Sequence, residues 1–224
     1  MLLLAALALP SRGADFAEAV RRTMDGRTVQ ATLGPSETPL PLELSNFLLD
    51  RPDLSAFIVA RRGIAPYRVE LLEPRRSRVD DGEGVSGEIT LVESSPTRRL
   101  YYGEGIHRAA LFPDIRATAV IVMDLRAGVD AAGRPTTTTT FSVWVRMRSR
   151  FVSGVVKTLR PFLRDTVVRK FSKAFVVADQ VGRLMVQDPV SVLAVADAFP
   201  ALAPEDRAAL VEMMSRLKPE EKTP

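Results

Sequence analysis

The stretch FVSGVVKTLRPFLRDTVVRKFSKAFVVADQVGRLMVQD, residues 151–188, is the longest helix-compatible run in the chain. Apolar side chains recur in it every three or four positions, as at Phe171 and Phe175, which is the spacing of one helix face. The apolar faces before and after Pro161 are offset by roughly a third of a turn. Because Pro161 has no N–H to donate within a helix, we expect a bend, a break or a helix start near it.

The region before this helix, residues 66–150, changes to a hydrophobic period of two, which is typical of β-strands. Alternating segments lie at 67–71, 85–91, 99–107, 117–126 and 136–149. With a further alternating segment at 27–33, they predict a sheet of about six strands. The short loops between consecutive segments, rich in Asp, Gly and Pro, indicate an antiparallel meander.

One face of this predicted sheet is strongly apolar, and most residues of the other face, including Arg99, are polar. This is the pattern of an antiparallel sheet with one buried and one wet face. Gly87, Gly103 and Gly105 lie inside strand segments, where glycine often marks a bulge or bend, so we expect the sheet to curl. The expected inner face comprises Tyr67, Val69, Leu71, Val85, Ile89, Leu91, Leu100, Tyr102, Ile106, Phe141, Val143, Val145 and Met147.

The segment before the meander carries helical patterns. Residues 15–24 predict a short helix, and Gly34 together with Pro35, Pro39 and Pro41 predicts a loop after the first strand. Residues 42–60 predict two short helices separated at Arg51-Pro52. The second is mostly apolar where a DNA-reading helix would need polar side chains, which argues against a nucleic-acid partner.

The N-terminus begins with an apolar block at residues 2–9, followed by Pro10, Ser11 and Gly13. This is the pattern of a secretory signal, and residues 1–13 are predicted to be one. The block is shorter than the about 20 residues that span a bilayer. A periplasmic or secreted location is therefore expected, with a buried N-terminal helix or membrane association as the alternatives.

Composition indicates an ordinary globular protein, with 46% hydrophobic and 26% charged residues and no cysteine. The absence of cysteine excludes disulfides, thiolate metal sites and cysteine nucleophiles. Between residues 141 and 190, ten Lys or Arg stand against three Asp or Glu. This excess suits either a solvated helix face or contact with an anionic partner such as lipid headgroups.

The sequence contains no evident catalytic or metal-binding motif. The single histidine, His107, lies in a strand segment on the opposite face from Tyr102, where a structural or surface role is expected. There is no Gly-rich phosphate loop, no HExxH and no serine elbow. We therefore predict no catalytic residue, no metal site and no cofactor, and we expect that the protein is not an enzyme.

The order of elements, from a strand through the paired short helices of residues 42–60 and a run of antiparallel strands to a long helix with Pro161 near its start, resembles the START-like, or SRPBCC, helix-grip superfamily. The resemblance covers residues 27–188. It implies an α+β fold in which a curved antiparallel sheet wraps around a long C-terminal helix and encloses a deep cavity. Residues 14–189 form the expected ligand-binding domain, and residues 190–224 form a helical appendage.

Members of this superfamily mostly bind or transfer lipids, sterols or other hydrophobic molecules. The resemblance therefore implies an internal ligand site, and we expect binding or transfer without catalysis. The basic helix favours peripheral contact with an anionic membrane, and the question of a protein partner is left open. Tyr102 and Glu104 are candidates to orient the ligand, although hydrogen bonding within the core or at the sheet edge explains such residues more often. The expected ligand-binding residues are Tyr67, Leu91, Tyr102, Glu104, Phe141, Val143, Val145, Phe162 and Phe175.

Two other functions fit the same sequence. The first is a cyclase-type enzyme that acts on a bound hydrophobic substrate and uses polar groups inside the cavity, with Tyr102 and Glu104 as the candidates. The second is a membrane-associated scaffold that uses the helices after Pro189 to bind a partner. The identity of the ligand and the oligomeric state are left open.

Overall fold

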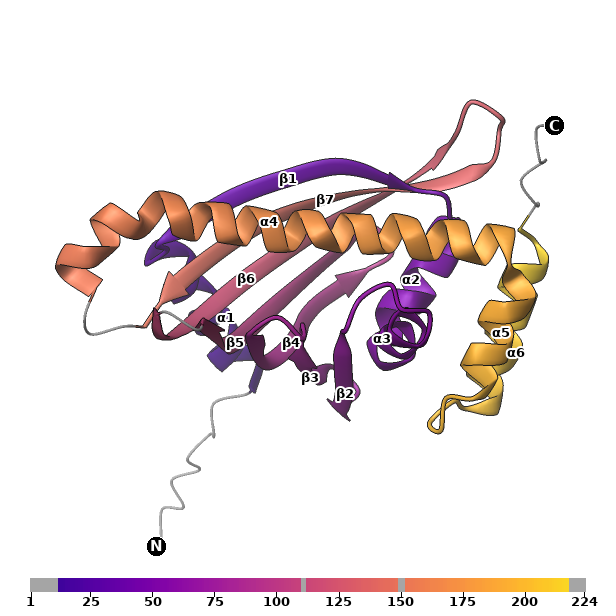
Figure 1. Ribbon diagram of the computed structural model, residues 1–224, viewed down its shortest axis with the longest axis horizontal. Coiled ribbons are helices and arrows are strands. Elements are labelled where there is room, and N and C mark those ends of the chain that lie inside the picture. Colours follow the sequence, from indigo (N-terminus) through magenta and orange to yellow (C-terminus); the bar gives the residue numbers. More distant parts are fainter. Residues whose placement is uncertain (1–11, 110–111, 149–151, 218–224) are drawn as a thin grey trace, which may run out of the picture.

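The computed structural model describes residues 12–109, 112–148 and 152–217. Within them the long helix α4 runs across one face of a curved antiparallel sheet, and α1 lies on the other face (Figure 1). The predicted α+β helix-grip architecture is confirmed. The elements are α1 (Arg12–Asp25), β1 (Val29–Thr38), α2 (Leu42–Asp50), α3 (Pro52–Arg61), β2 (Arg68–Glu73), β3 (Arg76–Asp80), β4 (Val85–Ser95), β5 (Arg98–Ala109), β6 (Phe112–Val129), β7 (Pro135–Met147), α4 (Val152–Gln187), α5 (Pro189–Asp197) and α6 (Pro204–Ser215).

The sheet has seven strands in the order β1-β7-β6-β5-β4-β3-β2, and every neighbouring pair is antiparallel. Strands β2 to β7 form the predicted meander, and β1 joins it beside β7. The strand absent from the prediction is β3, whose sequence RSRVD has one aliphatic residue and three charges. Such a segment carries too weak an alternation to be recognised by its period.

Strand β1 continues past the point where a loop was expected. It passes through the cis Gly34–Pro35 peptide to Thr38, and its register to β7 shifts between Leu33 and Ser36. Gly34 has a φ of 98°, and a Cβ there would lie 2.7 Å from the carbonyl oxygen of Thr139. The glycine therefore marks a bulge within a strand, and the expected loop is wrong at this position.

Helix α4 closes the sheet over β1 and β7. Phe171 and Phe175 of the helix contact Phe141 of β7, with ring centroids 5.5 and 4.8 Å apart. These rings join a core cluster with Val143, which has no exposed surface, and its neighbours on β1. The helix is a single element that continues through Pro161, so it neither breaks nor begins there, and the bend stays a prediction.

A second core cluster forms where the end of α4 meets α2, α3, α5 and α6. Leu54, Ile58 and Leu210 have no exposed surface in it. Asp188 caps α5 by accepting a hydrogen bond from the Ser191 amide, and Arg51 forms an ion pair with Asp206 of α6. Figure 1 shows α5 and α6 beside the end of α4, and their apolar side chains pack into the same core as the two short helices.

Helix α1 covers the part of the outer face that β5, β6 and β7 form. Phe16 packs edge-on against Tyr102 with centroids 6.0 Å apart, and the hydroxyls of Thr23 and Thr118 are 3.0 Å apart. The residues predicted to be a signal peptide lie outside the described residues, apart from the first two positions of α1. No helix in the described ranges has both the length and the hydropathy needed to cross a membrane.

Candidate functional site

A cavity of about 460 Å³ lies between α4, the inner face of the sheet and the short helices α2 and α3. It is neither sealed nor a shallow surface groove. Apolar side chains make up most of its wall, and every strand from β1 to β7 contributes at least one residue. The apolar lining on the sheet consists of Val69, Leu71, Val79, Ile89, Leu91, Ile121, Met123, Leu125 and Phe141.

Helical residues complete the apolar wall. Along α4, Phe171, Ala174, Phe175 and Ala178 line the cavity at intervals of three or one, so that one face of the helix points into it. On the opposite side the lining residues are Leu48, Leu49, Ala56, Ile58 and Val59 of α2 and α3. The predicted helix face is therefore the one that roofs the cavity.

A polar group lies at the end of the cavity near α2. Arg99 of β5 is 2% exposed; its Nη1 donates to Asp50 Oδ1 at 2.6 Å, and its Nη2 donates to Asn46 Oδ1 at 2.9 Å. Burial alone lowers the pKa of Arg99, but the hydrogen bond to Asp50, the adjacent Tyr101 and the charge of Asp50 raise it above its usual value. Arg99 is thus a buried, permanently charged residue with two partners on α2.

Tyr101 lies beside this pair and lines the cavity. Burial raises the pKa of its phenol, although the adjacent Arg99 guanidinium opposes that shift. The phenol is therefore neutral at physiological pH. Tyr67, a second cavity tyrosine, lies on the segment between α3 and β2; its pKa is also raised by burial, with Lys173, Asp81 and Glu83 nearby.

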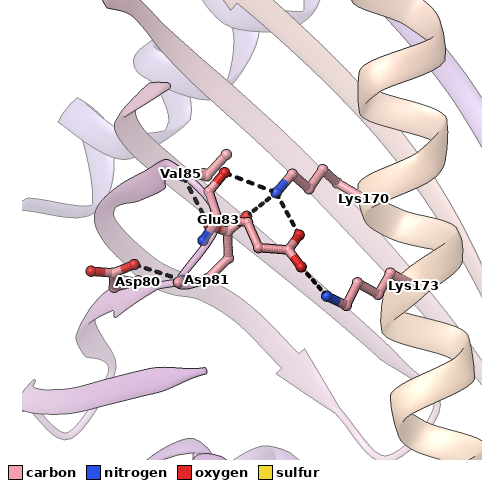
Figure 2. A network of polar contacts seen from close by, with 7 residues as sticks. Asp80, Asp81, Glu83, Val85, Lys170 and Lys173 are labelled. Carbon is pink, nitrogen blue, oxygen red and sulfur yellow. Dashed lines mark hydrogen bonds and ion pairs between the residues drawn. The ribbon is translucent and has the colours of Figure 1, made fainter. Parts of the chain in front are cut away.

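Ion pairs join α4 to the loop between β3 and β4 (Figure 2). Lys170 Nζ lies 2.6 Å from Asp81 Oδ2 and 3.0 Å from Glu83 Oε2, and Lys173 binds the other oxygen of Glu83. The loop is itself ordered by Asp81, whose Oδ1 accepts hydrogen bonds from the amides of Glu83 and Val85 at 2.7 and 2.9 Å.

These contacts lower the pKa of the loop carboxylates. Hydrogen bonds from Lys173 and Lys170 lower the pKa of Glu83 to about 2. Burial opposes the shift at Asp81, but the hydrogen bonds from Lys170 and from the loop amides keep its pKa below the usual value. Lys170 directly precedes Phe171 and Lys173 directly precedes Ala174. Since Phe171 and Ala174 line the cavity, the ion pairs lie on α4 at the edge of the cavity.

Four of the residues expected to bind ligand line the cavity: Tyr67, Leu91, Phe141 and Phe175. Val143 and Val145 share the face of Phe141 but belong to the core cluster beside the cavity. Phe162 belongs to α4, but its side chain lies outside the described residues.

The expectation that Tyr102 and Glu104 lie on the inner face is wrong. Tyr101 pairs with Ile121 and Tyr102 pairs with Val120, which places the odd-numbered residues of β5 on the cavity side. Tyr102 donates to Glu104 Oε1 at 2.6 Å beneath α1, and Arg148 donates to the same oxygen at 3.0 Å. Burial and then the Glu104 hydrogen bond raise the pKa of Tyr102 to about 12.

The strand had been placed one residue out of phase, so Leu100 and Ile106 are also on the outer face. Its sequence RLYYGEGIH has a tyrosine on each face and glycines on one of them, so the apolar count favours the wrong side. Arg99 was expected on the wet face because it is charged, and the partner that permits its burial lies 49 positions away in the sequence.

Sequence reasoning missed Tyr101, Asp50 and Arg99 as cavity-end residues. One signal in the sequence could have placed Tyr101 on the cavity side. Gly103 and Gly105 lie on the same face of β5 as Tyr101, and glycine inside a strand often marks a sharp bend of the sheet. His107 shares this face of β5 but does not line the cavity. Among the described residues, no group of three or more His, Asp or Glu is arranged to hold a metal ion.

Comparison with known proteins found similar folds only among solved structures. No protein-family model matches the chain, and no curated protein matches its sequence. A conserved protein from Geobacillus kaustophilus has 14% identity and a TM-score of 0.44, over 69% of this chain and 95% of that one. Ara h 8.0201 has 13% identity and a TM-score of 0.41, over 68% and 97%. XoxI from Bacillus cereus has 11% identity and a TM-score of 0.38, over 69% and 94%.

Proposed function

We propose that the protein binds a hydrophobic small molecule in the cavity beneath α4 and carries it without catalysis. The observation that supports this is the cavity itself, about 460 Å³ in volume and lined chiefly by aliphatic and aromatic side chains. Ligand sites typically have volumes of about 300–1,000 Å³ with a few polar groups among apolar walls. Protein interiors are otherwise close-packed, so an apolar space of this size is an unusual feature for a core without a ligand.

The resemblance of the element order to the START-like superfamily points the same way, since most of its members bind or transfer hydrophobic molecules. A cyclase-type activity is less well supported. Its two candidate groups, Tyr102 and Glu104, lie on the outer face and do not line the cavity. The carrier function is therefore preferred.

Contact with an anionic membrane surface is part of the proposal. Arg164 and Arg169 of α4 are exposed and could meet lipid headgroups. Lys170 and Lys173 in the same basic region are paired with the β3–β4 loop. Pairing within the fold therefore reduces the excess of positive charge available to a membrane, and the contact is expected to be weak and sensitive to salt.

Filling the cavity tests the proposal. Ala174→Trp projects a large ring from α4 into the cavity, whereas Ser172→Trp places the same ring on an exposed position of the same helix. We expect the first variant to weaken binding of the neutral apolar dye Nile red by at least about tenfold and the second to leave it unchanged. Fluorescence titration measures both, and equal binding by Ala174→Trp and the native chain would contradict the proposal.

A further inference from the structure

The cavity wall is mostly apolar, and its end near α2 holds a charged side chain whose hydrogen-bonding capacity is only partly used. Asp50 and Arg75 are the charged residues among the described cavity lining. Arg75 lies on the exposed turn between β2 and β3, where its Nη2 donates to the Val92 carbonyl at 3.0 Å. The charged side chain at the α2 end of the cavity is therefore Asp50, with Tyr101 beside it and Arg99 behind them. The uncharged polar residues of the lining, besides Tyr101, are Thr38, Ser45, Ser55, Tyr67, Ser77 and Thr139.

Arg99 is not available to a ligand anion. Its Nη1 and Nη2 are occupied by Asp50 and Asn46, and its Nε is fully buried without a hydrogen-bond partner in the described structure. A ligand carboxylate entering this end would meet the Asp50 carboxylate, whose side chain is 57% exposed. The Asp50–Arg99 pair carries no net charge, so the site offers little to offset the desolvation of an anionic head group.

Tyr101 and Asp50 nevertheless offer one donor and one acceptor. Arg99 lies beside the Tyr101 phenol and can only donate, so it cannot take the phenol proton, which is left for another partner. Asp50 uses Oδ1 to accept from Arg99, and its Oδ2 makes no hydrogen bond within the described ranges. A group that both accepts and donates would satisfy the two atoms at once.

Building on the proposed function, we infer that the cavity selects a neutral apolar molecule with a hydroxyl group at one end. The hydroxyl oxygen accepts from Tyr101, and the hydroxyl proton goes to Asp50. A carbonyl could accept from Tyr101 but could not donate to Asp50, and a carboxylate would add repulsion from Asp50. An ammonium would be attracted by Asp50 and repelled by Arg99, which is permanently charged.

The test compares three probes with the same chain length, 1-dodecanol, dodecanoate and dodecylammonium, as competitors of Nile red at pH 8. We expect the native chain to bind dodecanol about tenfold more tightly than either ion. Tyr101→Phe keeps the ring and removes the hydroxyl, and should weaken dodecanol binding about five- to tenfold while leaving dodecanoate unchanged. Tyr102→Phe is the matched control, since the neighbouring hydroxyl faces away from the cavity, and should bind all three probes like the native chain.

The outcomes separate the two proposals. If the native chain fails to bind Nile red, the carrier function itself is overturned. If it binds Nile red but ranks dodecanoate or dodecylammonium equal to or above dodecanol, the carrier function stands and the hydroxyl preference is overturned. The same conclusion follows if Tyr101→Phe keeps the full preference. The ranking by the native chain decides the question even if Tyr101→Phe does not fold.

Discussion

Arg99 is the residue whose placement most affects the end of the cavity. A fully charged guanidinium is buried there because Asp50 and Asn46, both on α2, supply hydrogen-bond acceptors. Its neighbour Arg98 points to the other face, where it forms an exposed pair with Asp124 at 2.8 Å. Adjacent arginines thus provide a buried and an exposed version of the same interaction.

We expect Asp50→Ala to reduce the free energy of unfolding by about 2 kcal/mol, because it leaves a buried cation with one of its acceptors missing. Asp124→Ala removes the partner of the exposed Arg98 and should change the stability by no more than about 0.5 kcal/mol. Urea unfolding followed by circular dichroism measures both values. Equal effects of the two substitutions would show that the Arg99 pair is no stronger than a surface pair.

At the scale of elements, α4 is held in different ways along the two sides of the cavity. Toward β1 and β7 it is packed through Phe171 and Phe175 against Phe141. Toward β3 and β4 it is joined to the Asp81–Glu83 segment by Lys170 and Lys173 (Figure 2). Ion pairs respond to pH and salt whereas apolar packing does not, so the second side is the one expected to open for a ligand.

Acid should therefore speed the release of bound Nile red. The folded-state pKa of Glu83, about 2, lies below its ordinary value of 4.5, so its ion pairs stabilise the closed loop above about pH 4.5 and lose that effect as the pH falls toward 2. The double variant Lys170→Ala with Lys173→Ala should release dye quickly already at pH 7 and show little further acceleration in this range.

Arg183→Ala serves as the control for release, because it removes an α4 cation whose partner Asp179 lies on the same helix. Its release rate should follow that of the native chain across the pH range. Stopped-flow fluorescence after mixing with excess unlabelled competitor measures the rates. Identical pH profiles for the native chain and the double variant would show that the loop does not control release.

On the scale of the whole molecule, the helices after Asp188 are part of the core that supports the cavity. Leu210 of α6 and Val192 of α5 have no exposed surface and pack with Leu54 and Ile58 of α3. Because Ile58 also lines the cavity, the C-terminal helices lie directly behind its wall. This packing gives the region a structural role.

The buried and exposed faces of α6 provide the test of that role. Leu210→Ala should lower the free energy of unfolding by about 3 kcal/mol, as expected for a fully buried leucine. Val211→Ala, at the neighbouring exposed position, should cost less than about 1 kcal/mol. Thermal and urea unfolding measure both, and a small effect of Leu210→Ala would indicate that α6 is an independent appendage.

Local periodicity was enough to predict the long helix, five of the seven strands over most of their length, the two short helices and their order. These features depend on side chains three or two positions apart, so the pattern contains them directly. β3 was missed and the second half of β1 was taken for a loop, since a charged strand and a glycine-proline bulge have no apolar alternation. Tyr67, Leu91, Phe141 and Phe175 were placed beside the cavity by the same alternation.

By itself, then, the sequence determined a curved antiparallel sheet with a long helix across it and an apolar inner face. Only the tertiary structure decided which tyrosine of β5 faces the cavity. A one-residue slip reverses both faces of a strand, and each face of β5 has a buried side chain, Arg99 on one and Tyr102 on the other. It also decided that Arg99 is buried, since its acceptors come from a helix distant in the sequence. The polar end of the cavity depends on contacts between segments that no local pattern records.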